Sequence, residues 1–321
     1  MASVLCVPGG VFAQAVGRRV RIAILSGGSP DASAQRDIID PFVQGLRALG
    51  YVDGQNTTLD WRWADGRPER LPALLAELLR LEPDVLVAVG PRPAELAKDL
   101  DRTVPVVALA VNDPVRYGLA ASLARPGGNI TGISSWGGEL VARRLQLLKD
   151  LVPGARRVAV LSNPVTVPDS KAFVVFLAAF EKPLGLEVKL YEARGAAEFE
   201  PAFNAMARDQ VGGLLVLADA TYYHERVRLG ELVLKARLPS VWGGRDYLRD
   251  GGGLASYQSV FSEIFQRGPA LVDKVLKGAR PGDIPFERAN KLELVVNLKA
   301  ARALGITVPA ALMVAADEVI E

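Results

Sequence analysis

Residues Val104 to Trp136 carry the pattern from which the fold class can be predicted. Residues 104–110 read VPVVALA, residues 111–115 read VNDPV, and residues 126–136 read PGGNITGISSW. The first run has the apolar character of a strand buried on both faces of a parallel sheet. The residues after that run predict a ligand-facing loop, a short helix, a second short strand and a crossing into another domain.

Upstream of this stretch, apolar runs alternate with helical patterns. Residues 20–25 and 84–89 are apolar runs, residues 57–63 alternate as a strand does, and leucines at 71–79 form a helical stripe. Asp40 and Pro41 fit the N-cap and first residue of the helix between the first two strands. This rhythm predicts βαβ units on a parallel sheet.

Downstream, the pattern restarts. RVAVLSNP at 157–164 matches VRIAILSG at 20–27 in type, and later runs parallel the earlier strands. We expect a structural duplication, although any two doubly wound domains would give such a match. Either way the chain is α/β with two Rossmann-like, doubly wound lobes. We assign residues 18–133 plus 251–281 to the first lobe and residues 134–250 plus 282–321 to the second.

Composition limits the function classes. The 321 residues carry a formal net charge of +2, so no strong nucleic-acid or membrane field is expected. One Cys and one His leave little scope for a metal site or for His-based nucleophilic catalysis. We expect no cofactor, no metal and no nucleic-acid partner.

The N-terminus suggests export. Residues 2–15 are small and apolar, and Ala13-Gln14-Ala15 is an A-x-A pattern of the kind found at signal-peptidase sites. The basic region of a signal peptide is missing, so residues 1–17 are read as a signal-peptide remnant, with a frayed tail as the alternative. The lone Cys6 follows Leu5, which is not small, and so fits a lipoprotein anchor poorly.

Several catalytic motifs are absent from the sequence. There is no G-x-G-x-x-G after the first strand, no P-loop and no G-x-S-x-G elbow. His224 precedes Glu225 without forming an H-E-x-x-H motif, and is interpreted as a solvated residue at a helix start. These absences argue against a nucleotide enzyme, a triad hydrolase and a zinc enzyme.

Polar and small residues gather where the strands of parallel sheets end, which is where ligands bind. Helix N-termini after Gly90 and Asp219 could offer N–H groups to a carboxylate, and Arg245 could pair with it bidentately. Tyr222, Trp242, Tyr247 and Tyr257 could wall a ring. The candidate ligand-binding residues at the strand ends are Ser26, Gly27, Gly28, Ser29, Gly90, Pro91, Asn112, Asp113, Asn163, Asp219, Thr221, Arg245, Tyr247 and Tyr257.

Each candidate has a structural alternative. Asn112-Asp113-Pro114 and Asp219 suit helix caps at least as well as ligand contacts. Arg245 could simply bridge the lobes. Trp136 fits packing beneath the helix that it opens better than a place in the cleft.

Several long stretches resemble a known family. They include GLRALGYVDGQN (45–56), WRWADGRPERLP (61–72), SLARPGGNITG (122–132), VAVLSNP (158–164), LELVVNLK (292–299) and ADEVIE (316–321). With Asp113-Pro114-Val115, they make the chain, from Arg19 to Glu321, similar to the substrate-binding proteins of ABC transporters, of the tryptophan/tyrosine type.

The resemblance implies a type I periplasmic binding protein, in which two lobes are joined by three crossings. It implies binding roles for the Ser26–Ser29 loop, Gly90-Pro91, Asn112-Asp113, Asn163, Asp219 and Arg245, and adds Ser135. The implied ligand is a small molecule, with aromatic amino acids and aromatic acids as candidates.

The resulting hypothesis is a non-catalytic, periplasmic solute receptor that closes by a hinge and delivers its solute to an ABC permease in the inner membrane. One alternative is an enzyme using the same cleft. The other is a ligand-sensing regulator, although the segment before Val20 is too short and too uncharged for a helix-turn-helix.

Overall fold

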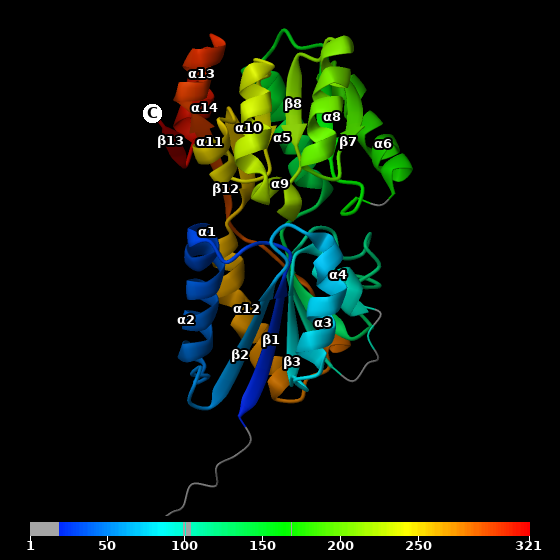
Figure 1. Cartoon of the computed structure of the whole chain (residues 1–321), viewed down its shortest axis with the longest axis vertical. Helices are drawn as coiled ribbons and strands as arrows, with labels where there is room; N and C mark the ends of the chain where they lie inside the picture. The colour runs from blue at the N-terminus through cyan, green and yellow to red at the C-terminus, as the bar shows by residue number, and fades with distance from the viewer. Residues whose placement is uncertain (1–18, 99, 101–103, 168) are drawn as a thin grey trace, which may run out of the picture.

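A computed structural model describes residues 19–98, 100, 104–167 and 169–321. The predicted signal-peptide remnant at 1–17 and Cys6 lie outside the described residues. Figure 1 shows two stacked α/β lobes, each a sheet with helices on both faces. The α/β class with two doubly wound lobes is therefore confirmed.

The first lobe is built on a parallel sheet, called sheet A. Its strand order is β11-β5-β4-β3-β1-β2, and every pairing in it is parallel. The strands are β1 (Val20–Ser26), β2 (Thr57–Trp63), β3 (Val85–Val89), β4 (Val106–Val111), β5 (Ile130–Ser134) and β11 (Glu287–Arg288).

Alternate residues of each strand serve the two faces of sheet A. Ile22 and Ile24 pack under α2 (Asp40–Ala48) and α12 (Phe261–Leu276). Ala23 and Leu25 face the opposite way, under α3 (Leu71–Leu79) and α4 (Pro91–Lys98). Because both faces are covered, the strands read as continuous apolar runs. Short turns η2 (Pro68–Arg70) and η3 (Pro281–Asp283) complete the lobe.

The second lobe is built on sheet B, in the order β13-β12-β10-β9-β8-β6-β7. All its pairings are parallel except that of β10 with β12. The strands are β6 (Arg157–Ser162), β7 (Glu187–Glu192), β8 (Gly213–Val216), β9 (Ser240–Trp242), β10 (Ala255–Ser259), β12 (Leu292–Asn297) and β13 (Glu318–Ile320).

Sheet B repeats the arrangement of sheet A. One face packs against α5 (Gly138–Leu151), α6 (Ser170–Ala178) and α13 (Leu298–Leu304), and the other against α8 (Ala196–Arg208), α10 (Arg226–Lys235) and α11 (Asp246–Gly251). The short helices α7 (Glu181–Leu184), α9 (Ala220–His224) and α14 (Ala310–Ala315) make up the remainder. The matching sequence patterns thus correspond to matching layers.

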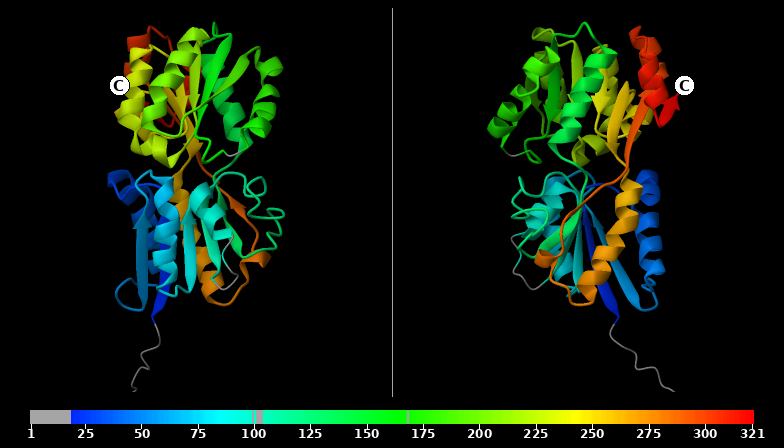
Figure 2. Two further views of the ribbon diagram at one scale, coloured as in Figure 1. Left: turned by 45° about the vertical axis from the view of Figure 1, so that its right-hand side comes forward. Right: turned by 180° about the vertical axis from the view of Figure 1, so that it is seen from behind.

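The chain crosses between the lobes three times, after β5, after β10 and after β11, as Figure 2 shows from behind. The crossing segments are tied together. Ser259 Oγ donates to the carbonyl of Ser135 at 2.8 Å, and Trp136 Nε1 donates to the carbonyl of Ala289 at 2.7 Å. These hydrogen bonds join the three segments into one hinge region.

The predicted lobe boundaries were wrong in two places. Strand β10, expected in the first lobe, pairs with β9 and β12 in sheet B, and only then does the chain return to form α12. Strand β11, expected in the second lobe, pairs with β5 in sheet A. Strand β10 lies between β9 and β12, and β11 extends the edge of sheet A beside β5. Neither position can be read from the strand's own sequence.

Two helix predictions also need correction. The helix predicted to begin at Asp40 is preceded by further helical turns. The Asp31 carboxylate caps α1 (Ala32–Ala34), and a π-helical turn η1 (Gln35–Ile39) continues into α2. No helix follows Asn112, where the chain makes turns instead. Gly118 there has a φ of +64°, which ends any helical run.

Candidate functional site

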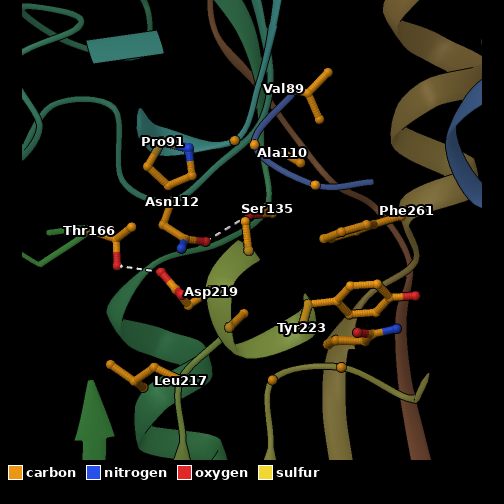
Figure 3. A pocket seen from close by; sticks show the side chains of 18 of the residues that line it. Val89, Pro91, Ala110, Asn112, Ser135, Thr166, Leu217, Asp219, Tyr223 and Phe261 are labelled. Atoms are coloured by element: carbon orange, nitrogen blue, oxygen red, sulfur yellow. Dashed lines mark hydrogen bonds between the residues drawn. The ribbon is translucent and has the colours of Figure 1, made fainter. Parts of the chain in front are cut away.

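A cleft of about 310 Å³ lies between the lobes. Strand ends of both sheets line it: the loops after β1, β3 and β4 face those after β8 and β9 (Figure 3). The volume is at the small end of the range for small-molecule sites. The cleft is therefore sized for a small solute.

Most of the predicted site residues do meet here. The structure brings together Ser26, Gly27, Gly28, Ser29, Gly90, Pro91, Asn112, Asp113, Ser135, Asp219, Thr221, Arg245 and Tyr247 in the cleft lining. Asn163 does not line the cleft but is buried behind Asp219, and its Nδ2 donates to Asp219 Oδ1 at 3.2 Å. Strand-end position, read from the sequence, was a good guide to the cleft.

The predicted aromatic wall is mostly wrong. Tyr222 and Trp242 are fully buried in the second lobe's core, and Tyr257 packs against the opposite core cluster. Tyr247 lines the cleft, but its hydroxyl donates to the carbonyl of Asp219 at 3.0 Å. Packing against the core clusters sets the direction of these rings, which the sequence alone leaves open.

A different set of aromatic side chains walls the cleft. Trp63 ends β2 and Trp136 follows β5, so strand-end position could have found both. Trp136 is therefore a cleft residue as well as a packed one. The full aromatic lining is Trp63, Tyr117, Trp136, Phe173, Phe176, Tyr223, Tyr247 and Phe261.

Asp219 acts as the N-cap of α9. Its Oδ1 accepts from the backbone N–H groups of Thr221 and Tyr222 at 2.9 and 3.0 Å, and its Oδ2 accepts from Thr166 Oγ1 at 2.9 Å. The N–H groups expected to be free for a ligand carboxylate are thus already used. The α4 start offers little more, because Pro91 and Pro93 have no N–H.

Replacing Asp219 by alanine is expected to lower the free energy of unfolding by about 3 kcal/mol, because several buried donors lose their acceptor. Asp169→Ala, which removes an exposed cap with a single bond on α6, should cost only about 1 kcal/mol. Urea unfolding followed by circular dichroism measures both. Equal losses would contradict the buried network around Asp219.

Arg245 bridges the lobes and is not free for a ligand. Its Nη2 lies 2.8 Å from Asp37 Oδ1 in the first lobe, and its Nη1 lies 3.5 Å from Glu293 Oε2. Burial raises the pKa of Glu293, against the opposing effects of Gln258 and Arg245. The bidentate role predicted for Arg245 therefore goes to protein carboxylates.

Other contacts also span the cleft mouth. Thr221 Oγ1 donates to the carbonyl of Gly66 at 2.7 Å, and Tyr117 donates to the carbonyl of Thr166 at 3.0 Å. Exposed His224 ends α9, rather than starting a helix as predicted, and its Nδ1 lies 3.4 Å from Ser29 Oγ. The lobes thus touch directly, as in a closed arrangement.

Polar groups on the first lobe's side are held in place by one another. Asn112 Oδ1 accepts from Ser135 Oγ at 2.8 Å, and Ser26 Oγ accepts from the backbone of Gly28 at 3.2 Å. Figure 3 shows the Asn112–Ser135 bond at the cleft wall. The bond from Ser135 orients the Asn112 amide, and the bond from Gly28 orients the Ser26 hydroxyl.

The described residues contain neither a metal cluster nor a membrane-spanning helix. No group of three or more His, Cys, Asp or Glu residues within them could hold a metal ion. Within the same residues, no helix combines the length and apolar character needed to span a bilayer.

Two hinged α/β lobes around a solute-sized cleft define the class of two-lobe binding proteins. The family of ABC transporter substrate-binding proteins matches residues 22–320, and the chain belongs to that family. A tyrosine-binding protein of Clostridioides difficile (strain R20291) is 25% identical over 263 residues, or 82% of this chain and 75% of the relative.

Solved structures agree on the fold. A conserved domain protein of Vibrio cholerae is 25% identical, with a TM-score of 0.85 over 94% of this chain and 100% of that chain. An ABC domain from Streptococcus pneumonia in complex with L-Trp is 24% identical, with a TM-score of 0.85 over the same shares. The type I periplasmic binding fold expected from the sequence is confirmed.

Proposed function

We propose that this protein is the solute receptor of an ABC importer and that it binds an aromatic amino acid or aromatic acid between its lobes. The observation that carries the proposal is the cleft, in which strand-end loops of both lobes and eight aromatic side chains surround one small volume. Rings supply a large apolar contact and a fixed stacking geometry for a ring-bearing solute. The similarity to a tyrosine-binding protein supports the same ligand class.

Hinge closure is a consequence of the same geometry. A ligand that contacts both lobes favours the closed form by its differential affinity for that form. The hydrogen-bonded hinge region lets the lobes rotate as units. The direct contacts between the lobes at the cleft mouth then stabilise the closed form. The closed form then presents one face of each lobe to a membrane permease. This role requires a location outside the cytoplasm.

The first test is a ligand titration. Intrinsic fluorescence is expected to change when L-tyrosine, L-tryptophan or 3,4-dihydroxybenzoate binds, because Trp63 and Trp136 line the cleft. The melting temperature should rise in parallel, since a ligand that binds only the folded state stabilises it by mass action. D-glucose, a solute of similar size without an aromatic ring or a charge, is the control. A flat response to all three aromatic probes by both methods would rule out the proposed ligand class.

One observation favours a cleft enzyme as the second candidate. Ser29 Oγ and His224 Nδ1 lie 3.4 Å apart, which is the approach of a nucleophile to a base. A working triad also needs a third group that orients the histidine. Within the described residues, no carboxylate is hydrogen-bonded to His224, so the pair lacks that group. Ester or amide turnover that Ser29→Ala abolishes would favour the enzyme.

A further inference from the structure

The arginines that line the cleft differ in their partners. Arg92 pairs with Glu95 at 3.0 Å, and Arg245 pairs with Asp37 and Glu293. Arg116 is exposed and lies over the ring of Phe173. These three guanidinium groups are either paired or at the rim.

Arg144 is different. It projects from α5 and is only 6% exposed, yet it lines the cleft. Its Nε donates to the backbone carbonyl of Tyr257 at 2.6 Å, which fixes the side chain. Among the described residues no ion pair to its guanidinium is formed, so its Nη1 and Nη2 donors have no carboxylate.

The charge on Arg144 persists despite its burial. Burial lowers the pKa of Arg144 to about 10, and the nearby Tyr247 and Tyr257 oppose that shift only partly. The group is therefore still protonated at neutral pH. A buried cation without a counter-charge is costly, and such groups are commonly found where an anion binds.

The surroundings of Arg144 indicate which anion fits. Leu140 and Val141, on the preceding turn of α5, line the cleft beside it, and Leu217 lines it from the end of β8. An apolar body would pack on these side chains. A carboxylate at one end of that body would meet a planar fork of donors that matches it.

The other expected anion sites are already taken. The N–H groups at the start of α9 bind Asp219, and Arg245 binds Asp37. Each carboxylate that lines the cleft already has a partner: Asp31, Asp37, Asp113, Asp219, Asp246 and Glu293. Arg144 is thus the buried cation of the cleft that protein groups leave unneutralised.

We propose that Arg144 is the anchor for the carboxylate of the ligand, so that the cleft selects ring-bearing acids over their neutral analogues. The inference rests on the proposed solute-receptor function and assigns the residue that holds the carboxylate shared by all the proposed ligands. The anchor belongs to the second lobe, so the acid group binds there and the first lobe closes on the rest of the molecule.

The test compares acids with their amides in three proteins by isothermal titration calorimetry. The probes are 3,4-dihydroxybenzoate, L-tyrosine and L-tryptophan, with the matching carboxamides. The natural protein should bind its preferred acid at least about 30-fold more tightly than the amide. Arg144→Met should lose at least about 30-fold for the acid and no longer discriminate. Arg143→Met, exposed and next to it on α5, is the matched control and should bind within about twofold.

Stability separates an anchor from a structural arginine. Methionine keeps the apolar stem and removes the unpaired charge, and it also removes the Nε donor to the carbonyl of Tyr257. Because relief of the buried charge offsets the loss of one hydrogen bond, the ligand-free Arg144→Met protein should melt within about 5 °C of the natural protein. A markedly lower melting temperature in the absence of ligand would show that Arg144 serves the fold and would overturn the assignment.

The remaining outcomes are also decisive. If an acid binds the natural protein and Arg144→Met equally well, or if the amide binds as well as the acid, the anchor is wrong while the receptor function stands. If no aromatic probe binds, the proposed ligand class fails. The melting temperature is then followed with acetate, succinate and glutamate, which carry no ring, at fixed ionic strength. A rise in the natural protein that is absent in Arg144→Met supports the anchor, and no rise with any carboxylate overturns it.

Discussion

Gly66→Gln is expected to weaken ligand binding by about 100-fold or more, because the new side chain stands where the second lobe must sit. A Cβ at Gly66 would lie 2.6 Å from His224 Cβ and 3.1 Å from the carbonyl oxygen of Ala220. Both neighbours belong to α9 of the second lobe. The closed form therefore has no room for the side chain, whereas the open form does.

The matched control for Gly66 is Gly54→Gln. Both glycines have a positive φ, +70° and +78°, so both substitutions cost about 1–2 kcal/mol of backbone strain. A Cβ at Gly54, however, meets nothing within 4 Å. Calorimetry gives the affinity, and small-angle X-ray scattering with saturating ligand gives the radius of gyration, which should rise only for Gly66→Gln. Equal affinities in the two variants would mean that the bound form does not bring these surfaces together.

Gly132→Ala is expected to lower the free energy of unfolding by about 3 kcal/mol or more, which for a marginally stable protein threatens the fold. Gly132 is buried in β5, and a Cβ there would lie 1.8 Å from the carbonyl oxygen of Ala108 in β4. The two residues face each other in the parallel pairing of β4 and β5. Strand β4 would have to move, and packing on both of its faces opposes that movement.

Gly128→Ala is the control for Gly132, four residues earlier in the chain. A Cβ there meets nothing within 4 Å, so the free energy of unfolding should change by less than about 0.5 kcal/mol. Urea unfolding by circular dichroism measures both variants. If Gly132→Ala unfolds at the same urea concentration as Gly128→Ala, the close approach of β4 and β5 is wrong.

Sequence reasoning located the cleft well because topology fixes where strand ends meet. In parallel sheets, the residues after β1, β3 and β4 must lie at one edge, so the Ser26–Ser29 loop, Gly90 and Asn112 could be assigned without knowing any packing. Trp63 and Trp136 also lie at strand ends and could have been assigned to the cleft in the same way. The fold could be predicted in the same way from the alternation of buried runs and helical stripes.

The same reasoning failed for charge partners. Arg245 and Asp219 are the residue types that bind carboxylates, yet each is satisfied inside the protein, Arg245 by Asp37, which lies 208 positions away. Arg144 carries no local signal, because on a helix it reads as one more surface arginine. Only the packing of α5 against β10, where Arg144 contacts Tyr257, shows that it is buried and lacks a counter-charge.

Local periodicity and the direction of the chain are enough to predict two layered α/β lobes and the edge of each sheet that faces the cleft. Only the folded structure shows which lobe contains β10 and β11, which rings face the cleft and which buried cation lacks a counter-charge. Those outcomes depend on contacts between segments far apart in the chain, where burial and pairing compete and no single stretch contains the answer.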